Sequence, residues 1–260
     1  MATVWLIGGT SESAALAAAL SSRGVPCVIT VTTESAKRLY ADMAQIRVGQ
    51  LSSQSLPGFV DQWQVSCILD ASHPFASEIS RLAIALAQTQ SIPYLRYERE
   101  TVDCTHQAAD PSVILVDSVE SLISSDILRY QRVLFTVGYR YLSQFSHLRP
   151  DARLFARILP SVEAIAGATA AGFAPADIIA LRPPVSAALE AALWQHWKIT
   201  RVVAKASGVP SGEATKRKLA DQLGVRLILI QRPQLVYPNQ TNSVIEATDF
   251  CSKIILVQNT

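Results

Sequence analysis

Short apolar runs alternate with longer amphipathic or alanine-rich stretches along most of this 260-residue chain. The first run, Val4–Ile7, leads into Gly8 and Gly9, and an alanine-rich stretch from Ala14 to Leu20 follows. Further strand-like runs cover residues 26–31, 46–48, 65–69, 94–97, 113–116, 132–138, 154–159, 178–181, 201–205 and 226–230. Strict alternation of strands and helices predicts parallel sheets with right-handed crossovers.

Helical periodicity fills most of the intervals between these runs. The predicted helices cover residues 36–43, 76–88, 119–128, 162–171, 186–197, 214–223 and 242–257. Because the strands are too many for one comfortable sheet, we expect an α/β protein with two Rossmann-like, doubly wound parallel-sheet domains. We place these domains at residues 1–130 and 131–260. No linker rich in Gly, Pro or Ser separates them, so close packing with a cleft between them is expected.

The charged residues favour the same boundary. Residues 1–130 hold 8 Lys or Arg and 13 Asp or Glu, whereas residues 131–260 hold 15 and 8. The balances are therefore −5 and +7, which indicates that the second half meets an anionic ligand. Nucleic acid is disfavoured as that ligand, since aromatics are only 7% of the chain and no basic run contains them.

Neither a membrane protein nor a secreted one is indicated. No apolar run approaches the ~20 residues of a membrane span, and no basic stretch precedes an apolar one at the N-terminus. The four cysteines, Cys27, Cys67, Cys104 and Cys251, form no C-x-x-C pair, which favours buried free thiols over disulfides or a metal site. We expect a cytoplasmic protein without a metal, either a monomer or a homodimer.

The first candidate site is the turn after the first apolar run. Gly8 and Gly9 allow a pyrophosphate to approach the backbone N–H groups there. Thr10 or Ser11 can cap the following helix, whose positive end then faces the phosphates, and Glu12 completes the motif. The spacing differs from G-x-G-x-x-G, so a strand-to-helix turn without a ligand is the alternative.

The second candidate site follows the second predicted strand, where the adenosine ribose of a dinucleotide normally lies. Thr32 and Thr33 come first, and Lys37 and Arg38 lie close behind. Hydroxyl groups and cations suit a 2′-phosphate better than a ribose diol, which favours NADPH as the cofactor. Glu34 argues for NADH instead.

The third candidate site is the turn from Asp70 to Ala76, which follows another predicted strand. Ser72 and His73 can offer hydrogen-bond donors to a cofactor, and the position before proline holds His73 out of the helical region. Equally, Asp70 and Ser72 can serve only to cap the next helix. His73 has no evident partner that would make it a general acid, so the catalytic residues remain unknown.

The fourth candidate site is the glycine-rich turn 205–212, which lies at a strand end beside several cations and is typical of an anion site. Its candidate ligands are Lys205, Ser207, Gly208 and Lys216. A solvated helix face accounts for Arg217 and Lys218 but poorly for a lysine at a strand end. Nothing supports a hydrolase or a P-loop protein, since no Ser-His-Asp arrangement, H-E-x-x-H motif or Walker A lysine is evident.

Together these motifs resemble the precorrin-6A reductase family of cobalamin biosynthesis, in the family's order and over nearly the whole chain. The matching segments are Gly8–Glu12, Asp70–Ala76, Val137–Arg140, Arg157–Pro160, Lys205–Gly208 and Ile230–Pro233. The resemblance implies two Rossmann-like domains and NADPH-dependent reduction of one macrocycle double bond, in precorrin-6A or its cobalt complex, to the 6B form. It adds Arg140 and Arg157 to the candidate substrate-binding residues, because this anionic tetrapyrrole carries many carboxylates.

Two positions depart from the family's motifs. Ala14 stands where an arginine is frequent, and Ala206 replaces the acid of the usual K-D-S-G, so neither position receives a role. Two other functions remain compatible with the predicted fold. One is a group transferase that uses a nucleotide-activated donor, and the other is a non-enzymatic NADPH-sensing protein.

Overall fold

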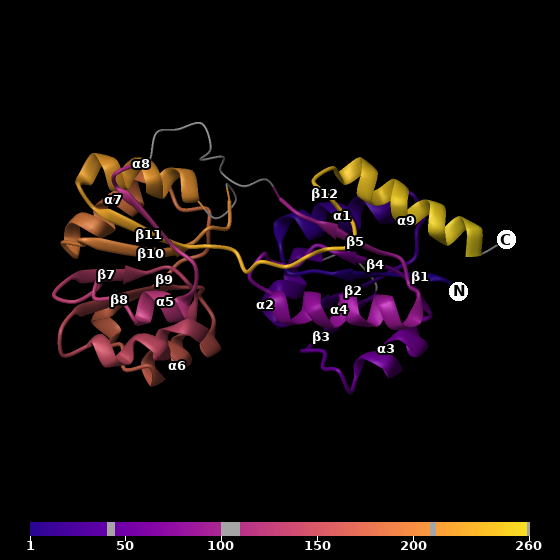
Figure 1. The fold of residues 1–260 in the computed structure, drawn as a ribbon, viewed down its shortest axis with the longest axis horizontal. Helices are drawn as coiled ribbons and strands as arrows, with labels where there is room; N and C mark the ends of the chain where they lie inside the picture. The colour runs from indigo at the N-terminus through magenta and orange to yellow at the C-terminus, as the bar shows by residue number, and fades with distance from the viewer. Residues whose placement is uncertain (41–44, 100–109, 209–211, 259–260) are drawn as a thin grey trace. The chain divides into compact units, whose positions relative to one another are not determined.

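A computed structural model describes residues 1–40, 45–99, 110–208 and 212–258. The chain divides into two compact units, the first formed by Met1–Arg99 with Gln234–Thr260 and the second by Glu100–Pro233. Each unit contains a six-stranded parallel sheet with helices on both faces (Figure 1). The expected α/β fold with two doubly wound parallel sheets is therefore confirmed.

The sheet of the first unit has the strand order β12-β5-β4-β1-β2-β3. Its strands are β1 (Thr3–Ile7), β2 (Cys27–Val31), β3 (Ile46–Val48), β4 (Val65–Asp70), β5 (Tyr94–Tyr97) and β12 (Gln240–Thr241). Its helices are α1 (Ser11–Ser22), α2 (Glu34–Lys37), α3 (Leu56–Trp63), α4 (Ser77–Gln90) and α9 (Val244–Gln258), with a 3₁₀ helix at Arg38–Tyr40. The chain runs from β1 to β3 on one side and resumes at β4 on the other, so the order reverses between β1 and β4.

The buried strand β1 divides its side chains between two layers of the core. Val4 and Leu6 belong to a cluster that includes residues of α1 and α9, whereas Trp5 and Ile7 belong to one that includes residues of α3 and α4. This division follows from the alternation of side chains along a strand. The sheet is therefore covered by helices on both faces.

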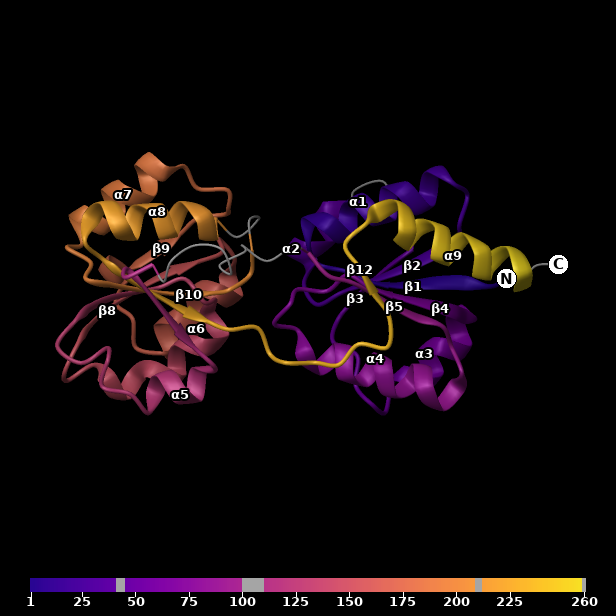
Figure 2. The same cartoon turned by 45° about the horizontal axis from the view of Figure 1, so that its top comes forward.

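The sheet of the second unit has the strand order β6-β11-β10-β7-β8-β9, and helices cover both of its faces (Figure 2). Its strands are β6 (Val113–Val116), β7 (Arg132–Phe135), β8 (Arg153–Ile158), β9 (Ile178–Ala180), β10 (Arg201–Lys205) and β11 (Arg226–Ile230). Its helices are α5 (Val119–Ile123), α6 (Val162–Ala170), α7 (Ala187–His196) and α8 (Glu213–Leu223), with 3₁₀ helices at Tyr139–Leu148 and Pro175–Asp177. The order here reverses between β7 and β10.

The division of the chain differs from the predicted boundary after residue 130. Strand β6, which we expected in the first domain, pairs with β11 of the second sheet. Strand β12 and helix α9, expected in the second domain, return to the first unit, where β12 pairs with β5 and α9 packs against α1 and β4. The correction arises because strand pairing is decided by partners distant in sequence.

The corrected division also changes the charge argument. The second unit, residues 100–233, holds 15 Lys or Arg and 12 Asp or Glu, a balance of +3. The first unit, formed by residues 1–99 and 234–260, holds 8 and 9, a balance of −1. The balance of the basic part falls from +7 to +3 mainly because the second unit includes the acidic residues between positions 100 and 130. The predicted strong asymmetry therefore belongs to the two sequence halves and not to the two units.

Three predicted elements are shorter than expected. Helix 36–43 is replaced by α2 and the 3₁₀ helix Arg38–Tyr40, and residues 41–44 lie outside the described part of the chain. Helix α5 ends at Ile123, since the Ser-Ser-Asp sequence that follows has low helix propensity. Strand β7 ends at Phe135, and the 3₁₀ helix Tyr139–Leu148 was not predicted.

Candidate functional site

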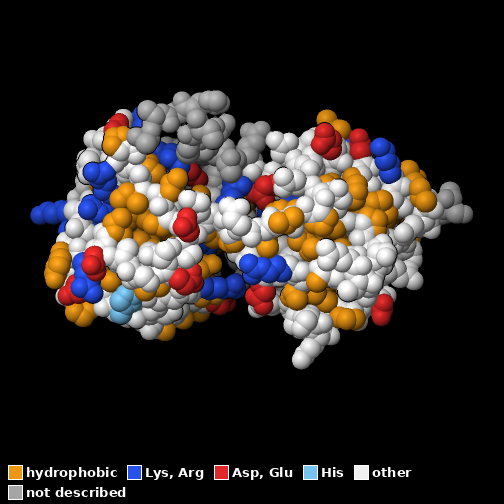
Figure 3. All heavy atoms as spheres, viewed as in Figure 1, with side chains coloured by type: hydrophobic (Ala, Val, Ile, Leu, Met, Phe, Trp, Pro, Cys, Tyr) orange, Lys and Arg blue, Asp and Glu red, His pale blue; other side chains and the backbone are white. Residues whose placement is uncertain are grey.

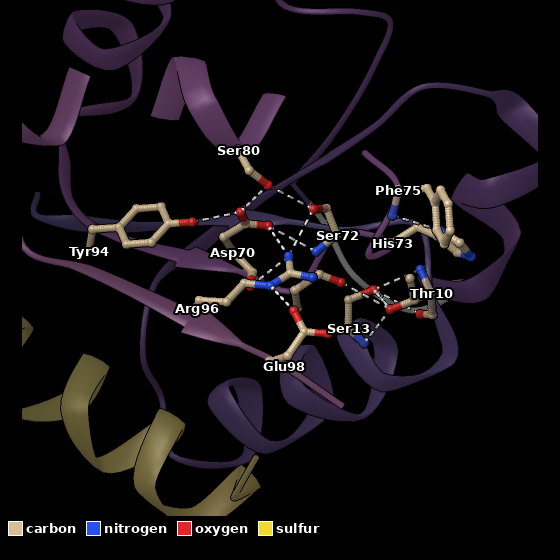
Figure 4. A network of polar contacts seen from close by, with 11 residues as sticks. Thr10, Ser13, Asp70, Ser72, His73, Phe75, Ser80, Tyr94, Arg96 and Glu98 are labelled. Carbon is tan, nitrogen blue, oxygen red and sulfur yellow. Dashed lines mark hydrogen bonds and ion pairs between the residues drawn. The ribbon is translucent and has the colours of Figure 1, made fainter. Parts of the chain in front are cut away.

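The switch point of the first sheet brings two predicted motifs together. In open parallel sheets, ligands collect where the strand order reverses, outside the carboxyl ends of the strands. Here Ile7 of β1 lies opposite Asp70 of β4, so the turns after both strands leave from the same edge. The Thr10 hydroxyl donates a hydrogen bond to the Ala71 carbonyl at 3.1 Å, which ties the two turns to each other. The first and third motifs therefore form one site (Figure 4).

Thr10, and not Ser11, is the N-cap of α1. Its hydroxyl accepts a hydrogen bond from the Ser13 N–H at 3.1 Å, and its own N–H donates to the Ser13 hydroxyl at 2.9 Å. This reciprocal capping box fixes the start of the helix. The first turn of α1 therefore has a defined position at the switch point, as an anion site at a helix N-terminus requires.

The two glycines of the turn lack a side chain for different structural reasons. Gly9 has a φ of +107°, and an ideal Cβ built on it has no neighbour within 4 Å, so the space in front of the turn is open. A Cβ on Gly8 would instead lie 2.4 Å from the hydroxyl oxygen of Tyr40. The open space at Gly9 suits the approach of a pyrophosphate, which stays a prediction, whereas Gly8 accommodates Tyr40.

We expect Gly8→Ala to lower the free energy of unfolding by roughly 1–3 kcal/mol, as overpacking of a filled core does. The added methyl group must displace the Tyr40 side chain, which is only 2% exposed. In a Tyr40→Phe background the same change should cost less, because the nearest atom has been removed. Denaturant unfolding of the four proteins measures the difference. An equal cost in both backgrounds would contradict the assigned contact.

The second motif follows β2, the neighbour of β1 in the sheet. Thr32, Thr33, Lys37 and Arg38 are all exposed. The Thr33 hydroxyl accepts a hydrogen bond from the Ala36 N–H at 3.1 Å and thereby caps α2. The Lys37 ammonium lies 4.0 Å from the Glu34 carboxylate, and such an exposed pair contributes little and exchanges readily for another anion. The motif thus presents cations after β2, next to the glycine turn that follows β1.

Asp70 is buried within the first unit and belongs to a polar network (Figure 4). One carboxylate oxygen accepts hydrogen bonds from the Ser72 N–H at 3.0 Å and from Arg96 at 2.9 Å. The other accepts from the hydroxyl groups of Ser80 at 2.6 Å and Tyr94 at 2.7 Å. Four internal donors thus surround the Asp70 carboxylate, an arrangement that supports the turn, and direct contact of Asp70 with a cofactor stays a prediction.

Ser72 also turns inward. It is 4% exposed, and its hydroxyl accepts a hydrogen bond from Arg96 at 3.0 Å. Neither Ser72 nor Asp70 caps α4, whose N-cap is Ala76 without a side-chain hydrogen bond. The alternative that these residues cap α4 is therefore wrong, whereas donation by Ser72 and His73 to a cofactor stays a prediction. His73 is half-buried, and its Nδ1 accepts from the Phe75 N–H at 3.2 Å, which shapes the turn locally.

Arg96 is the cation at the centre of this network, and sequence analysis did not single it out. Its side chain is 1% exposed, and its Nε donates to the Glu98 carboxylate at 2.9 Å. Burial lowers the pKa of Arg96, but the carboxylates of Asp70 and Glu98 outweigh this effect and raise it. Burial and the neighbouring Asp70 raise the pKa of Tyr94, which keeps its hydroxyl protonated. The one sequence signal was an arginine within the apolar strand β5.

Glu12 forms an ion pair with Arg99, at 3.2 Å, near the N-terminus of α1. The Ser11 hydroxyl donates a hydrogen bond to the same carboxylate at 3.0 Å. A carboxylate beside a phosphate site would repel the ligand, and the guanidinium of Arg99 offsets that charge. Arg99 follows β5 and was likewise not predicted, because nothing in the sequence places it beside residue 12.

The fourth motif lies at the switch point of the second sheet. Lys205 ends β10, and Arg140 lies at the start of the 3₁₀ helix Tyr139–Leu148, which follows the neighbouring strand β7. The Lys205 ammonium lies 4.1 Å from the centroid of the Tyr141 ring. Burial, and then the nearby charge of Arg140, lowers the pKa of Lys205 to about 8. A partly desolvated cation thus lies beside an exposed arginine at the edge where ligands collect.

Arg157 and Lys216 lie in the interior of the second unit. The Arg157 side chain is 9% exposed and forms an ion pair with Glu190, which is 4% exposed. Lys216 is 4% exposed, and burial, followed by the charge of Arg157, lowers its pKa to about 8, although Glu190 and Glu213 counteract this. Both side chains thus lie next to buried carboxylates, and their binding of a substrate carboxylate stays a prediction.

Ser207 and Gly208 are also buried. The Gly208 N–H donates a hydrogen bond to the Glu213 carboxylate at 3.1 Å, and that carboxylate also accepts from Arg217 at 2.9 Å. The acidic partners Glu190 and Glu213 were absent from our sequence analysis. Their burial depends on tertiary packing, which gives no local signal in the sequence.

The described ranges contain no group of three or more histidine, cysteine or acidic side chains placed to hold a metal ion. Cys27, Cys67 and Cys251 are free thiols, and the prediction for Cys104 falls on a residue outside those ranges. Among the helices that the structure describes, none is long and apolar enough to cross a membrane.

Two doubly wound parallel sheets, the first with a capped glycine turn at its switch point, define an α/β protein of the Rossmann type. Comparison with known families is more specific. The family model "Precorrin-6x reductase CbiJ/CobK" matches residues 3–252, and the chain belongs to this family of oxidoreductases. The resemblance in the motifs is therefore confirmed.

Curated relatives agree with this assignment. The chain is 46% identical to a cobalt-precorrin-6A reductase of Synechocystis sp., with 97% of each chain covered. It is 30% identical to a precorrin-6A reductase of Rhodococcus erythropolis, with 93% of each covered. The solved structure named CobK precorrin-6A reductase shares the fold, with a TM-score of 0.76, 24% identity and 97% of each chain covered.

Proposed function

We propose that this protein reduces one double bond of cobalt-precorrin-6A, with NADPH as the hydride donor, to give the corresponding 6B compound. The observation that carries the proposal is the glycine turn at the first switch point in a chain of this family. Relatives with 46% and 31% identity bear the cobalt-precorrin name, which favours the cobalt complex over metal-free precorrin-6A. The free thiols are in keeping with a cytoplasmic location.

The residues of the first unit fit a dinucleotide. Open space at Gly9 allows a pyrophosphate to approach the backbone, and the N-terminus of α1 favours its charge. The hydroxyl group of Thr32 and the cations of Lys37 and Arg38 would hold the 2′-phosphate of NADPH. NADH has only a ribose diol at that position, without a charge for the two cations to bind. NADPH would supply the hydride when it is bound, and a proton from the solvent would complete the reduction of the double bond. The Asp70 network keeps the neighbouring turn in place.

The second unit would hold the macrocycle through its carboxylates. Arg140 and Lys205 provide two cations at the second switch point, and desolvation strengthens the attraction of Lys205 for an anion. Arg157, Ser207, Gly208 and Lys216 would support that edge from within. We assign no catalytic side chain, since alignment of the donor with the acceptor carbon and exclusion of water account for the protein's part.

An anaerobic assay with each precorrin form and each nicotinamide tests this function. We expect NADPH oxidation to accompany a change in the macrocycle spectrum, with a higher kcat/KM for NADPH than for NADH. The preference should fall in a Lys37→Met, Arg38→Met double variant, because only NADPH carries a 2′-phosphate. Similar kcat/KM values for both cofactors would contradict the proposed NADPH specificity. If the protein binds NADPH but turns nothing over, the result would favour a sensor. If it binds a nucleotide-activated donor and transfers no hydride, the result would favour a transferase.

A further inference from the structure

Tyr40 connects the two parts of the proposed cofactor site that follow β1 and β2. It ends the 3₁₀ helix Arg38–Tyr40 and is 2% exposed. Its hydroxyl oxygen accepts a hydrogen bond from the Gly9 N–H at 2.7 Å and lies 2.5 Å from the Ser13 hydroxyl. Burial raises the pKa of Tyr40, so the phenol stays protonated and acts only as a hydrogen-bonding group.

The segment that carries the proposed 2′-phosphate ligands needs such an anchor. Helix α2 has four residues and the following 3₁₀ helix has three. Helices this short are not stable in water by themselves, so tertiary contacts must fix their position. Neither Lys37 nor Arg38 supplies a buried contact, since both are exposed. The buried side chain that ends this segment is Tyr40.

The phosphate turn is shaped to receive this side chain. Gly8 lacks the Cβ that would lie 2.4 Å from the Tyr40 hydroxyl oxygen, and Ser13 belongs to the capping box of α1. The same phenol oxygen therefore contacts the turn backbone and the first turn of the helix. Movement of Lys37 and Arg38 relative to the pyrophosphate turn would break these hydrogen bonds.

We propose that Tyr40 is a positioning residue for cofactor selectivity: it holds Lys37 and Arg38 at a fixed spacing from the phosphate turn, so that the pyrophosphate and the 2′-phosphate are bound together. The inference rests on the proposed use of NADPH. NADH lacks the 2′-phosphate, so its binding does not require that spacing. Loss of the Tyr40 hydroxyl therefore weakens NADPH binding more than NADH binding.

The test compares the dissociation constants of NADPH and NADH for wild type and Tyr40→Phe. One hydrogen bond corresponds to roughly a threefold to tenfold change in an equilibrium constant, so the Kd of NADPH should rise by about that factor. The Kd of NADH should change by less than about twofold, so the ratio of the two dissociation constants should move toward one. Tyr130→Phe serves as the matched control, because Tyr130 is 82% exposed in the other unit.

A second comparison tests whether Tyr40 acts through the two cations. In a Lys37→Met, Arg38→Met background, Tyr40→Phe should no longer alter the ratio of the two dissociation constants. Equal weakening of NADPH and NADH by Tyr40→Phe, or no change in either, would overturn the inference. If the wild-type protein binds NADPH and NADH equally well, the proposed use of NADPH is wrong too. The ratio of the two dissociation constants in the wild type therefore separates failure of the proposed cofactor from failure of the role of Tyr40.

Discussion

Replacing Arg96 with methionine is expected to lower the free energy of unfolding by about 3–5 kcal/mol, the range for removing one partner of a buried ion pair. The Asp70 carboxylate is 0% exposed and would keep its hydrogen bonds to Ser80 and Tyr94 but lose its cation. Methionine retains most of the apolar stem, but the variant also loses the guanidinium group whose Cζ lies 5.2 Å from the centroid of the Tyr237 ring. Denaturant unfolding, followed by tryptophan fluorescence, measures the loss.

A surface pair provides the control for this prediction. Arg129 forms an ion pair with Asp126 at 3.1 Å, and the two side chains are 50% and 84% exposed. Arg129→Met should change the free energy of unfolding by less than about 1 kcal/mol, as exposed pairs do. Combining Arg96→Met with Asp70→Asn should recover part of the stability, since no unpaired carboxylate remains buried. If Arg96→Met lowers the free energy of unfolding by less than about 1 kcal/mol, the prediction is wrong. Water or a rearrangement of the network would then replace the lost partner of the Asp70 carboxylate.

Replacing Lys205 with methionine is expected to lower kcat/KM for the macrocycle roughly tenfold or more, because a charge-assisted contact contributes about 1.5–3 kcal/mol. The Kd of NADPH should barely change, since the first unit is the proposed cofactor site. Lys218→Met is the matched control, with the same charge removed from an exposed position of the same unit. Loss of NADPH binding with unchanged macrocycle binding would reverse the assignment of ligands to units.

The pH dependence gives this prediction a second measurement. Burial and Arg140 lower the pKa of Lys205 to about 8, so the free protein loses this charge as the pH rises through that value. The wild-type kcat/KM for the macrocycle should therefore fall above about pH 8. Lys205→Arg keeps its charge at higher pH and should shift the fall upward. Added salt should weaken the wild-type contact, because screening reduces the same attraction.

Hydrophobic periodicity alone predicted the α/β class and most of the strands. Each buried strand is a short apolar run, and each turn carries local signals such as Gly8-Gly9 or the Asp70–Ala76 motif. These features depend on neighbours within a few residues, which a single sequence displays directly. The sequence by itself therefore determined the strand–helix order and the motifs at the carboxyl ends of the strands.

Tertiary structure alone decided which elements share a sheet and which polar side chains face inward. Strand β12 pairs with β5, and β6 pairs with β11, across long stretches of chain that periodicity does not relate. Asp70 and Lys216 became internal groups because Arg96, Glu190 and other distant charges meet them in the core. The Tyr40 hydroxyl reaches Gly9 only because β1 and β2 are neighbours. Such contacts join residues far apart in the chain, so no local pattern could specify them.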